Sequence, residues 1–214
     1  MPAKNEVRAV GTALVGGAAA DPPPVYRDRV SASELETEQL LLRRWREEDK
    51  APFAAMNADP AVMEFFPAAL SRAESDDLAD RFDAELDERG FCPWAVEVRE
   101  SGTFIGFIGL HAVPDTLSFA PAVEVGWRMA RPFWGRGFAT QGAGAALRYG
   151  FEELALDEIV SMTSVVNLRS RRVMERLGMS RSPDDDFDHP RVPEGHVLRP
   201  HVLHRLSRSD WRDR

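Results

Sequence analysis

The chain has 214 residues, of which 43% are hydrophobic and 29% are charged, so it can bury one sizeable core and lies near the upper size of a single domain. Its formal net charge of -8 argues against nucleic acid or an anionic membrane as the main partner, because both are bound through clustered lysine and arginine. Cys92 is the single cysteine, which excludes a disulfide framework or a thiolate metal site within one chain and is typical of a reducing cytoplasm.

Residues 1–35 differ in composition from the rest of the chain. They contain a Gly-Gly pair and the triplet Pro22–Pro24 and show no apolar periodicity, which predicts a disordered or loosely docked extension. A signal peptide is the alternative, because basic residues precede the apolar stretch Ala9–Val15, but this stretch is weak and lacks a leucine run. No segment reaches the ~18 consecutive apolar residues of a membrane helix. We therefore expect one folded domain over residues 36–211 in a cytoplasmic protein.

The chain shows regular patterns from Leu40 onward. Its first half predicts a strand, two short helices interrupted by prolines, an amphipathic helix that ends at Gly90, and a hairpin that turns at Ser101-Gly102. These elements are expected over residues 40–45, 49–57, 59–66, 71–89, 93–100 and 103–113.

The second half predicts two more strands, each followed by a helix. The expected ranges are 123–129, 139–154, 158–166 and 168–177, and Gly178 closes the last helix. Because the strands in the middle of the chain follow one another as a meander, the order favours an α+β fold over a doubly wound sheet.

A glycine-punctuated turn, FWGRGFAT, separates the strand 123–129 from its helix. Gly135 and Gly137 let the backbone approach a ligand closely, and a helix that begins here directs unpaired N–H groups and the positive end of its dipole outward. The turn is therefore typical of a phosphate-binding site. A tight structural loop remains an alternative. A dinucleotide-binding turn, with Asp157 downstream, is disfavoured because Thr140 occupies the position of its third glycine.

Three segments carry a family resemblance: LLLRRWREED (Leu40–Asp49), VEVGWRMARPFWGRGFATQG (Val123–Gly142) and NLRSRRVMERLGM (Asn167–Met179). In this order they resemble the GNAT superfamily of acyl-CoA-dependent N-acetyltransferases, and in particular its ribosomal-protein N-terminal acetyltransferase branch. The resemblance covers about residues 35–211. It implies a central, mixed and mostly antiparallel sheet of about seven strands, splayed around the cofactor cleft and flanked by helices.

In that family the pattern Arg/Gln-x-x-Gly-x-Gly/Ala binds the pyrophosphate of coenzyme A. Here Trp134 stands where Arg or Gln is expected, which removes one side-chain contact but keeps the backbone donors. The resemblance also implies that backbone groups of the strand 123–129 pair with the pantetheine arm and polarise the thioester carbonyl. With acetyl-CoA as co-substrate and no metal, the implied cofactor-binding residues are Trp127, Arg128, Met129, Trp134, Gly135, Arg136, Gly137, Phe138, Ala139, Thr140 and Asn167.

The resemblance implies two catalytic side chains. Glu124 is the expected base, acting through ordered water or by holding the amine; the alternative is a solvated edge carboxylate or an ion-pair partner of Arg128. Ser170 is the expected acid that protonates the leaving sulfur. The alternative is an ordinary helix start in which Asn167 is the N-cap. Many members of the family use tyrosine as the acid, but neither tyrosine of this chain falls at a matching place.

An acidic run lies near the C-terminus. Asp184–Asp186, Asp188 and His189 predict either an acidic mouth that attracts a cationic acceptor or a solvated loop. The histidines of this region lack the spacing of a zinc site, because His201 and His204 would face opposite sides of a strand.

Together these patterns predict an N-acetyltransferase that moves an acetyl group from acetyl-CoA to a primary amine by direct transfer in a ternary complex. The acceptor could be a peptide or protein N-terminus, a lysine-like side chain or a small amine, and the protein a monomer or homodimer. A covalent route would need a nucleophile such as cysteine, and Cys92 is far from these motifs in sequence. The alternatives are a non-catalytic acyl-CoA-binding protein of the same fold and, less favoured, a nicotinamide-dependent oxidoreductase.

Overall fold

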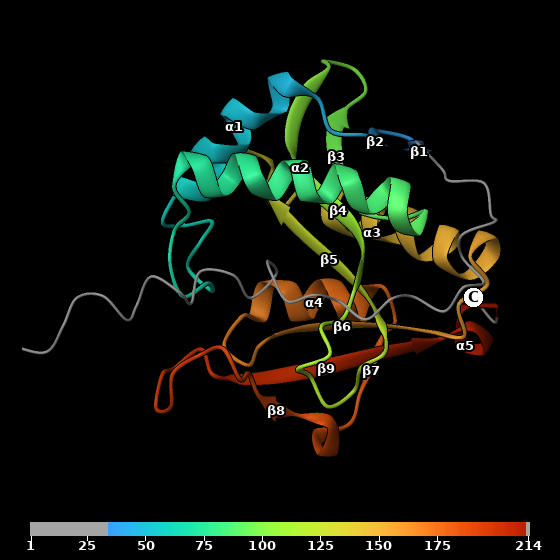
Figure 1. The fold of residues 1–214 in the computed structure, drawn as a ribbon. Helices are drawn as coiled ribbons and strands as arrows, with labels where there is room; N and C mark the ends of the chain where they lie inside the picture. The colour runs from blue at the N-terminus through green and yellow to red at the C-terminus, as the bar shows by residue number, and fades with distance from the viewer. Residues whose placement is uncertain (1–33, 213–214) are drawn as a thin grey trace, which may run out of the picture.

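The computed structural model describes residues 34–212 (Figure 1). The extension predicted for residues 1–35 lies outside this range except at its end, where Glu34 and Leu35 belong to the first strand. The strands are β1 (Glu34–Glu36), β2 (Leu40–Arg43), β3 (Pro93–Val98), β4 (Thr103–Ala112), β5 (Val123–Met129), β6 (Glu158–Ser164), β7 (Ser180–Arg181), β8 (Phe187–Asp188) and β9 (Pro200–Ser207). The helices are α1 (Glu47–Ala58), α2 (Arg72–Arg89), α3 (Phe138–Arg148), α4 (Leu168–Arg176) and α5 (Arg208–Arg212).

A single sheet of nine strands runs through the described part of the chain in the order β1-β2-β3-β4-β5-β6-β9-β7, and β8 pairs with β9. All neighbours are antiparallel except β5 and β6, which are parallel. The expected α+β class and mostly antiparallel sheet are confirmed. The sheet has more strands than the seven or so expected, because β1, β7 and β8 are only two or three residues long and too short to show an apolar period.

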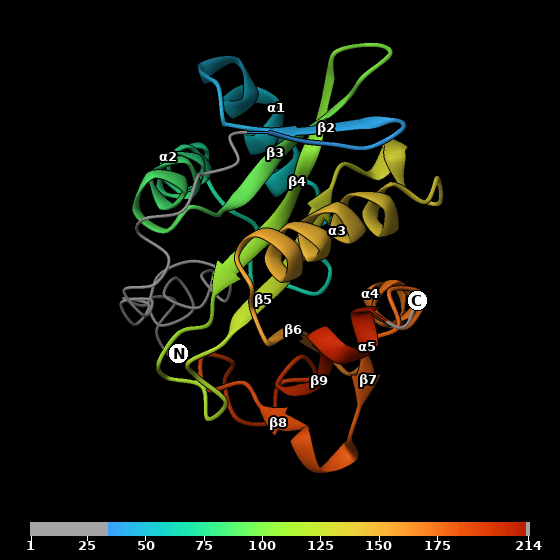
Figure 2. The same cartoon turned by 90° about the vertical axis from the view of Figure 1, so that its right-hand side faces the viewer.

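Helices cover both faces of the sheet. Figure 2 shows α1 and α2 on one side of β3 to β5 and α3 on the other. The core divides in the same way. Side chains such as Trp94, Ile108 and Val125 pack with α3, whereas Phe53, Phe82 and Phe107 form an aromatic cluster with α1 and α2. No helix between residues 34 and 212 is both long enough and apolar enough to cross a bilayer.

Local sequence explains α2 and the hairpin that follows it. Ser71 accepts a hydrogen bond from the Glu74 N–H and the Glu74 side chain accepts one from the Ser71 N–H, which is a capping box. The helix ends at Gly90, whose φ of 77° is the left-handed conformation of a C-terminal glycine. Strands β3 and β4 pair around Ser101-Gly102 as expected. This helix and hairpin are therefore confirmed within one or two residues.

Two expected helices differ from the structure. Residues 59–66 form turns instead of a helix, because Asp59 precedes Pro60 and is extended at φ -72° and ψ 116°. The helix expected over 139–154 ends at Arg148 and is followed by a π-helical turn, Tyr149–Glu153. The turn region 59–66 matters for function because it covers one end of the cavity described below.

The parallel pair β5 and β6 diverges within the sheet. The two strands meet at one register pair, Glu124 with Val160, and β5 then runs away from β6 toward Met129 (Figure 1). Backbone groups on this side of β5 therefore have no neighbouring strand beyond the first residues. The divergence opens the sheet between its two halves and determines where a ligand can enter.

Candidate active site

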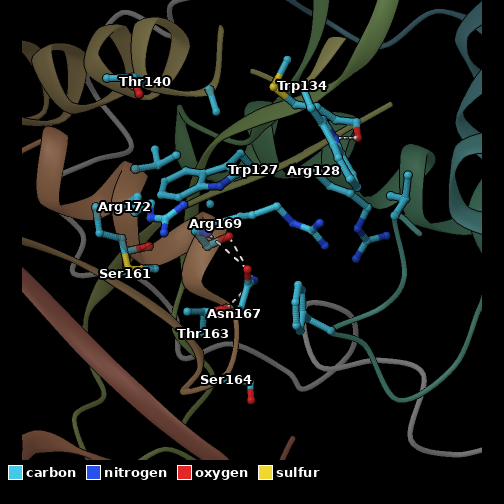
Figure 3. Close-up of a pocket in the computed structure, with 18 of the residues that line it drawn as sticks. Trp127, Arg128, Trp134, Thr140, Ser161, Thr163, Ser164, Asn167, Arg169 and Arg172 are labelled. Carbon is cyan, nitrogen blue, oxygen red and sulfur yellow. Dashed lines mark hydrogen bonds between the residues drawn. The ribbon is translucent and has the colours of Figure 1, made fainter. Parts of the chain in front are cut away.

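A cavity of about 400 Å³ occupies the opening between β5 and β6. Its walls come from both strands, the start of α3, α4 and the turn region 59–66, and Figure 3 shows Trp127, Trp134, Asn167 and Arg169 around it. The cavity brings together nearly all the residues expected from the sequence: Glu124, Trp127, Arg128, Met129, Trp134, Gly135, Gly137, Phe138, Ala139, Thr140, Asn167 and Ser170. Arg136 does not line it, and its guanidinium lies 5.4 Å from the centre of the Phe133 ring.

The glycine turn before α3 is open to the cavity. Gly135 and Gly137 have φ of 74° and 80°, and Gly137 is the N-cap of the helix. A Cβ added at either position would meet no heavy atom within 4 Å, so the turn faces free space. The first N–H groups of a helix lack partners within the helix and carry the positive end of its dipole. This geometry fits a diphosphate held by the backbone.

The register of β5 decides which backbone groups face the cavity. Just after β5, the Ala130 N–H donates to a β4 carbonyl at 2.8 Å. Hydrogen-bonded and non-hydrogen-bonded pairs alternate in antiparallel strands, so the backbone of Arg128 pairs with Phe107, whereas the backbone groups of Trp127 and Met129 face away from β4. The backbone of Arg128 therefore pairs with β4, although Arg128 is among the residues that line the cavity.

Trp134 holds the glycine turn against the end of β5. Its indole Nε1–H donates to the Met129 carbonyl at 2.7 Å, and its ring lies 4.7 Å from the guanidinium of Arg169 on α4. Arg169 also stacks on Phe65 and forms an ion pair with Glu64. The residue that replaces the Arg or Gln of the family pattern thus has a structural role, because it connects β5 with α4.

Glu124 is a buried carboxyl group with an incomplete set of hydrogen bonds. Its side chain is 3% exposed; Oε1 lies 3.5 Å from the Met162 N–H, and Oε2 has no partner among residues 34–212. Burial raises the pKa of Glu124 to about 7. A solvated edge carboxylate is therefore wrong, and Arg128 donates to Asn57 instead of to Glu124. A carboxyl with a pKa near neutrality suits proton transfer at physiological pH.

His111 on β4 lies opposite Glu124 and acts on it electrostatically, a relation that sequence patterns did not indicate. The two residues are register partners, so their side chains share a face. His111 Nδ1 lies 2.9 Å from a carboxylate oxygen of Glu85 on α2. Burial opposes protonation of His111, but the hydrogen bond and charge of Glu85 outweigh it and raise the pKa of His111. In its protonated form His111 lowers the pKa of Glu124 and limits the effect of burial.

Asn167 and Ser170 form a hydrogen-bonded pair at the start of α4. Asn167 caps the helix by accepting from the Ser170 N–H at 3.2 Å, and its amide Nδ2 donates to the Ser170 hydroxyl at 3.1 Å and to Thr163 at 2.9 Å (Figure 3). Because the Ser170 oxygen accepts from Asn167, its own proton is directed elsewhere. The N-cap interpretation and a cavity-facing hydroxyl are therefore compatible.

Two further residues of α4 line the cavity and were not expected from the sequence. Arg172 and Arg176 lie one turn apart on the same side of the helix, and both are exposed. Both residues belong to the arginine-rich run after Asn167, but the pattern of this run indicates only an amphipathic helix. Both residues place positive charge in the wall of the cavity.

The acidic run near the C-terminus is neutralised by arginines. Asp185 pairs with Arg205, Asp186 with Arg181, and Asp188 with Arg199, which favours the solvated loop over an acidic mouth. His189 and His201 do line the cavity, with ring centroids 4.9 Å apart. Burial lowers the pKa of His189 to about 4 and also lowers the pKa of His201, so both rings are neutral at pH 7. Over residues 34–212, His, Cys, Asp and Glu form no group of three suited to a metal.

Comparison with known proteins identifies the family. The model of the acetyltransferase (GNAT) domain matches residues 39–180. The chain belongs to the GNAT acetyltransferase family. The FsC-acetyl coenzyme A-N(2)-transacetylase of Aspergillus fumigatus is 31% identical over 186 residues, covering 83% of this chain and 77% of that protein.

Solved structures show the same GNAT fold. An acetyltransferase of the GNAT family from Bacillus anthracis has a TM-score of 0.69 at 22% identity, covering 82% of this chain and 99% of that chain. A Vibrio cholerae protein described as a ribosomal-protein-serine acetyltransferase has a TM-score of 0.66 at 14% identity, covering 83% of this chain and 99% of that chain. The predicted family and N-acetyltransferase class are confirmed, which argues against the nicotinamide-dependent alternative.

Proposed function

We propose that this GNAT enzyme transfers an acetyl group from acetyl-CoA to a primary amine by direct attack within a ternary complex. The observation that carries the proposal is Glu124, a buried carboxyl with a free oxygen and a pKa of about 7, at the point where β5 and β6 separate. Buried carboxyl groups with shifted pKa values in a cavity are typical of proton-transfer sites.

The cofactor would be held by the backbone more than by side chains. The N–H groups at the start of α3, from Gly137 to Thr140, would bind the diphosphate. The backbone groups of Trp127 and the N–H of Met129, which face away from β4, would pair with the pantetheine arm. Arg172 and Arg176 on α4 add positive charge to the cavity wall. When bound, acetyl-CoA supplies an activated thioester whose carbonyl a backbone N–H of β5 can polarise.

Glu124 would act on the amine. An amine with a pKa of about 10.4 must spend about 4.6 kcal/mol to be neutral at pH 7, whereas an α-amine with a pKa of about 7.7 to 8 needs only about 1 to 1.4 kcal/mol. A carboxylate with its pKa near 7 is a better base for either amine than an ordinary glutamate, because its proton affinity is closer to that of the amine. It can take the proton directly or through one water molecule.

Ser170 would complete the reaction by passing its proton to the departing thiolate while it takes up a proton from a water molecule in the cavity. Its hydroxyl faces the cavity and accepts from Asn167, which orients it. Serine is a weak acid, so this step depends on position more than on acidity.

The test combines binding with turnover. Acetyl-CoA at saturating concentration should raise the melting temperature of the protein, whereas NAD should not. Release of free thiol from acetyl-CoA should then require an amine, supplied as N-terminal peptides, lysine peptides, polyamines and aminoglycosides. Binding of acetyl-CoA without turnover of any amine would favour a non-catalytic acyl-CoA-binding role. No binding of acetyl-CoA would contradict the proposal altogether.

A further inference from the structure

Arg128 is a buried cation that faces the active-site cavity without a compensating anion. Its side chain is 5% exposed and lines the cavity. Nη1 donates to the Asn57 side-chain oxygen at 2.7 Å, and buried Nε has no partner among residues 34–212. Most of the donor capacity of this guanidinium is therefore unused by the described protein.

Comparison with a second buried arginine shows that the lack of a counter-ion at Arg128 is unusual. Arg43 is 3% exposed, and carboxylates of Asp49 and Glu97 lie 2.7 Å and 2.8 Å from its nitrogens. Arg128 has no ion pair among the described residues, and burial alone lowers its pKa to about 9. It remains protonated at pH 7. A buried charge without a counter-ion is costly, and proteins rarely keep one without a functional reason.

The guanidinium is nevertheless held in place. It stacks 4.1 Å from the centre of the Phe66 ring and 5.4 Å from that of Phe107. Asn57, which accepts its one hydrogen bond, in turn donates to Ser75 at 3.2 Å. Two aromatic faces and one amide fix the plane of the cation without neutralising it. Such a fixed guanidinium is suited to a planar anion such as a carboxylate.

The position of Arg128 places it on the acceptor side of β5. Arg128 and Glu124 are four residues apart on the same face of the strand, which is the face covered by α1 and α2. Their Cα atoms are roughly 13 Å apart at the usual rise of a strand, and Gly126 lies between them on this face. Trp127 points to the other face, toward the glycine turn and α3. The base and the free cation therefore border the same space.

We propose that Arg128 binds a carboxylate of the acceptor, so that the substrate is a small molecule carrying both a primary amine and a carboxylate. The inference rests on the proposed acetyl transfer and adds the acceptor class to it. Glu124 then faces the amine and Arg128 the acid group. Polyamines, which carry no anion, fit this arrangement poorly.

Matched pairs of acceptors test the proposal. The panel consists of the common α-amino acids and of ω-amino acids from β-alanine to 6-aminohexanoate, each compared with its primary amide. The wild-type enzyme should use the acids with a kcat/KM on the order of 10- to 100-fold above the amides, because the amide loses a charge-assisted hydrogen bond. The best spacing in the ω-series measures the distance between the two groups.

Arg128→Gln should abolish this preference, mainly through KM for the acids, while its affinity for acetyl-CoA stays unchanged. Arg148→Gln, which removes an exposed arginine of α3 outside the cavity, should keep the wild-type preference. If Arg128→Gln does not fold, the ratio of kcat/KM for acids to kcat/KM for amides in the wild-type enzyme still tests the proposed acceptor class.

Equal use of acids and amides, turnover of amines alone, or no turnover of the panel by a protein that binds acetyl-CoA would overturn the acceptor class. Failure to bind acetyl-CoA would instead overturn the proposed transferase reaction.

Discussion

Two charged side chains on one face of β5 break the rule that buried charges are paired. Glu124 leaves one oxygen without a partner and Arg128 leaves most of its donors free, although Arg43 in the same sheet is fully paired. Both exceptions border one cavity. Violations of local rules concentrate at functional sites, so these two residues support the reaction site proposed above.

Replacing the base should separate binding from chemistry. Glu124→Gln should leave the dissociation constant of acetyl-CoA unchanged and lower kcat by about 10²- to 10⁴-fold, because general base catalysis contributes on this order. The loss should be largest below the pKa of the acceptor amine. In the wild-type enzyme kcat should fall as pH drops through about 7, the pKa of Glu124, and in the variant this limb should be replaced by one at the pKa of the acceptor amine. A variant with full activity at pH 7 would remove Glu124 from the mechanism.

The same carboxyl should affect stability with a defined sign. The pKa of Glu124 rises from 4.5 to about 7 on folding, so the native state binds its proton more tightly than the unfolded chain and loses stability as pH rises from about 4.5 through 7. Glu124→Gln should therefore be more stable than the wild type at pH 8, by up to about 3 kcal/mol, and nearly equal to it at pH 4.5. Urea unfolding at both pH values measures this. A constant difference would mean that Glu124 is not protonated in this range.

His111 on the neighbouring strand should affect the pKa of Glu124. Its imidazolium lowers the pKa of Glu124, so His111→Gln should move the acid limb of the kcat profile to higher pH and reduce the rate at pH 7. The affinity for acetyl-CoA should not change, because His111 does not line the cavity. An unchanged pH profile would limit His111 to packing against Phe82 and its ion pair with Glu85.

Sequence patterns identify functional residues when the role of the residue follows from the periodicity of the strand or helix that contains it. Strand alternation predicts that Glu124 and Arg128 share one face, and helical spacing from Asn167 predicts that the Ser170 hydroxyl points inward. The functions of His111 and of the Arg128 side chain depend on cross-strand register and on a turn far away in sequence, which one sequence does not reveal. For the same reason the alternation could not tell that the backbone of Arg128 faces β4.

At the scale of elements, the start of α3 is the structure that the proposed cofactor site depends on. Its two glycines adopt left-handed conformations before a helix whose first N–H groups face the cavity. Left-handed φ values are strained for any other residue, most of all a β-branched one. The turn therefore combines access for a ligand with a backbone shape that only glycine adopts readily.

Substitution of two glycines in this region should affect acetyl-CoA binding differently. Gly137→Val should abolish measurable acetyl-CoA binding, because it strains a φ of 80° and adds methyl groups in the space that the backbone offers to the ligand. Gly144→Ala, in the middle of α3 and outside the cavity, should bind as the wild type does and gain about 0.5 to 1 kcal/mol in stability. Calorimetric titration and thermal unfolding of both variants provide the comparison. Equal affinity in Gly137→Val and the wild type would refute the phosphate-site assignment.

Elements were predictable where the chain supplies its own start and stop signals. The capping box at Ser71 and the left-handed Gly90 define α2, and Ser101-Gly102 defines the hairpin. Residues 59–66 contain the apolar content of a helix, but prolines on both sides leave only turns. The short strands β7 and β8 form by pairing with β9. This pairing depends on residues distant in sequence, so local sequence patterns do not predict it.

For the whole molecule, the cavity where β5 diverges from β6 is lined from two sides of the sheet. The side with α3 and α4 presents helix N–H groups and arginines, whereas the side with α1 and α2 presents the base, the aromatic residues and Arg128. A cofactor and an acceptor entering from opposite sides would meet at Glu124. This arrangement explains how an acidic protein can still offer two locally positive surfaces to anionic groups.

A crystal structure of the complex with coenzyme A tests this account most directly. We expect the diphosphate on the N–H groups of residues 137–140, the pantetheine arm along Trp127 and Met129, and the thiol at the opening beside Glu124. A diphosphate bound away from the start of α3, or an arm that does not follow β5, would contradict it.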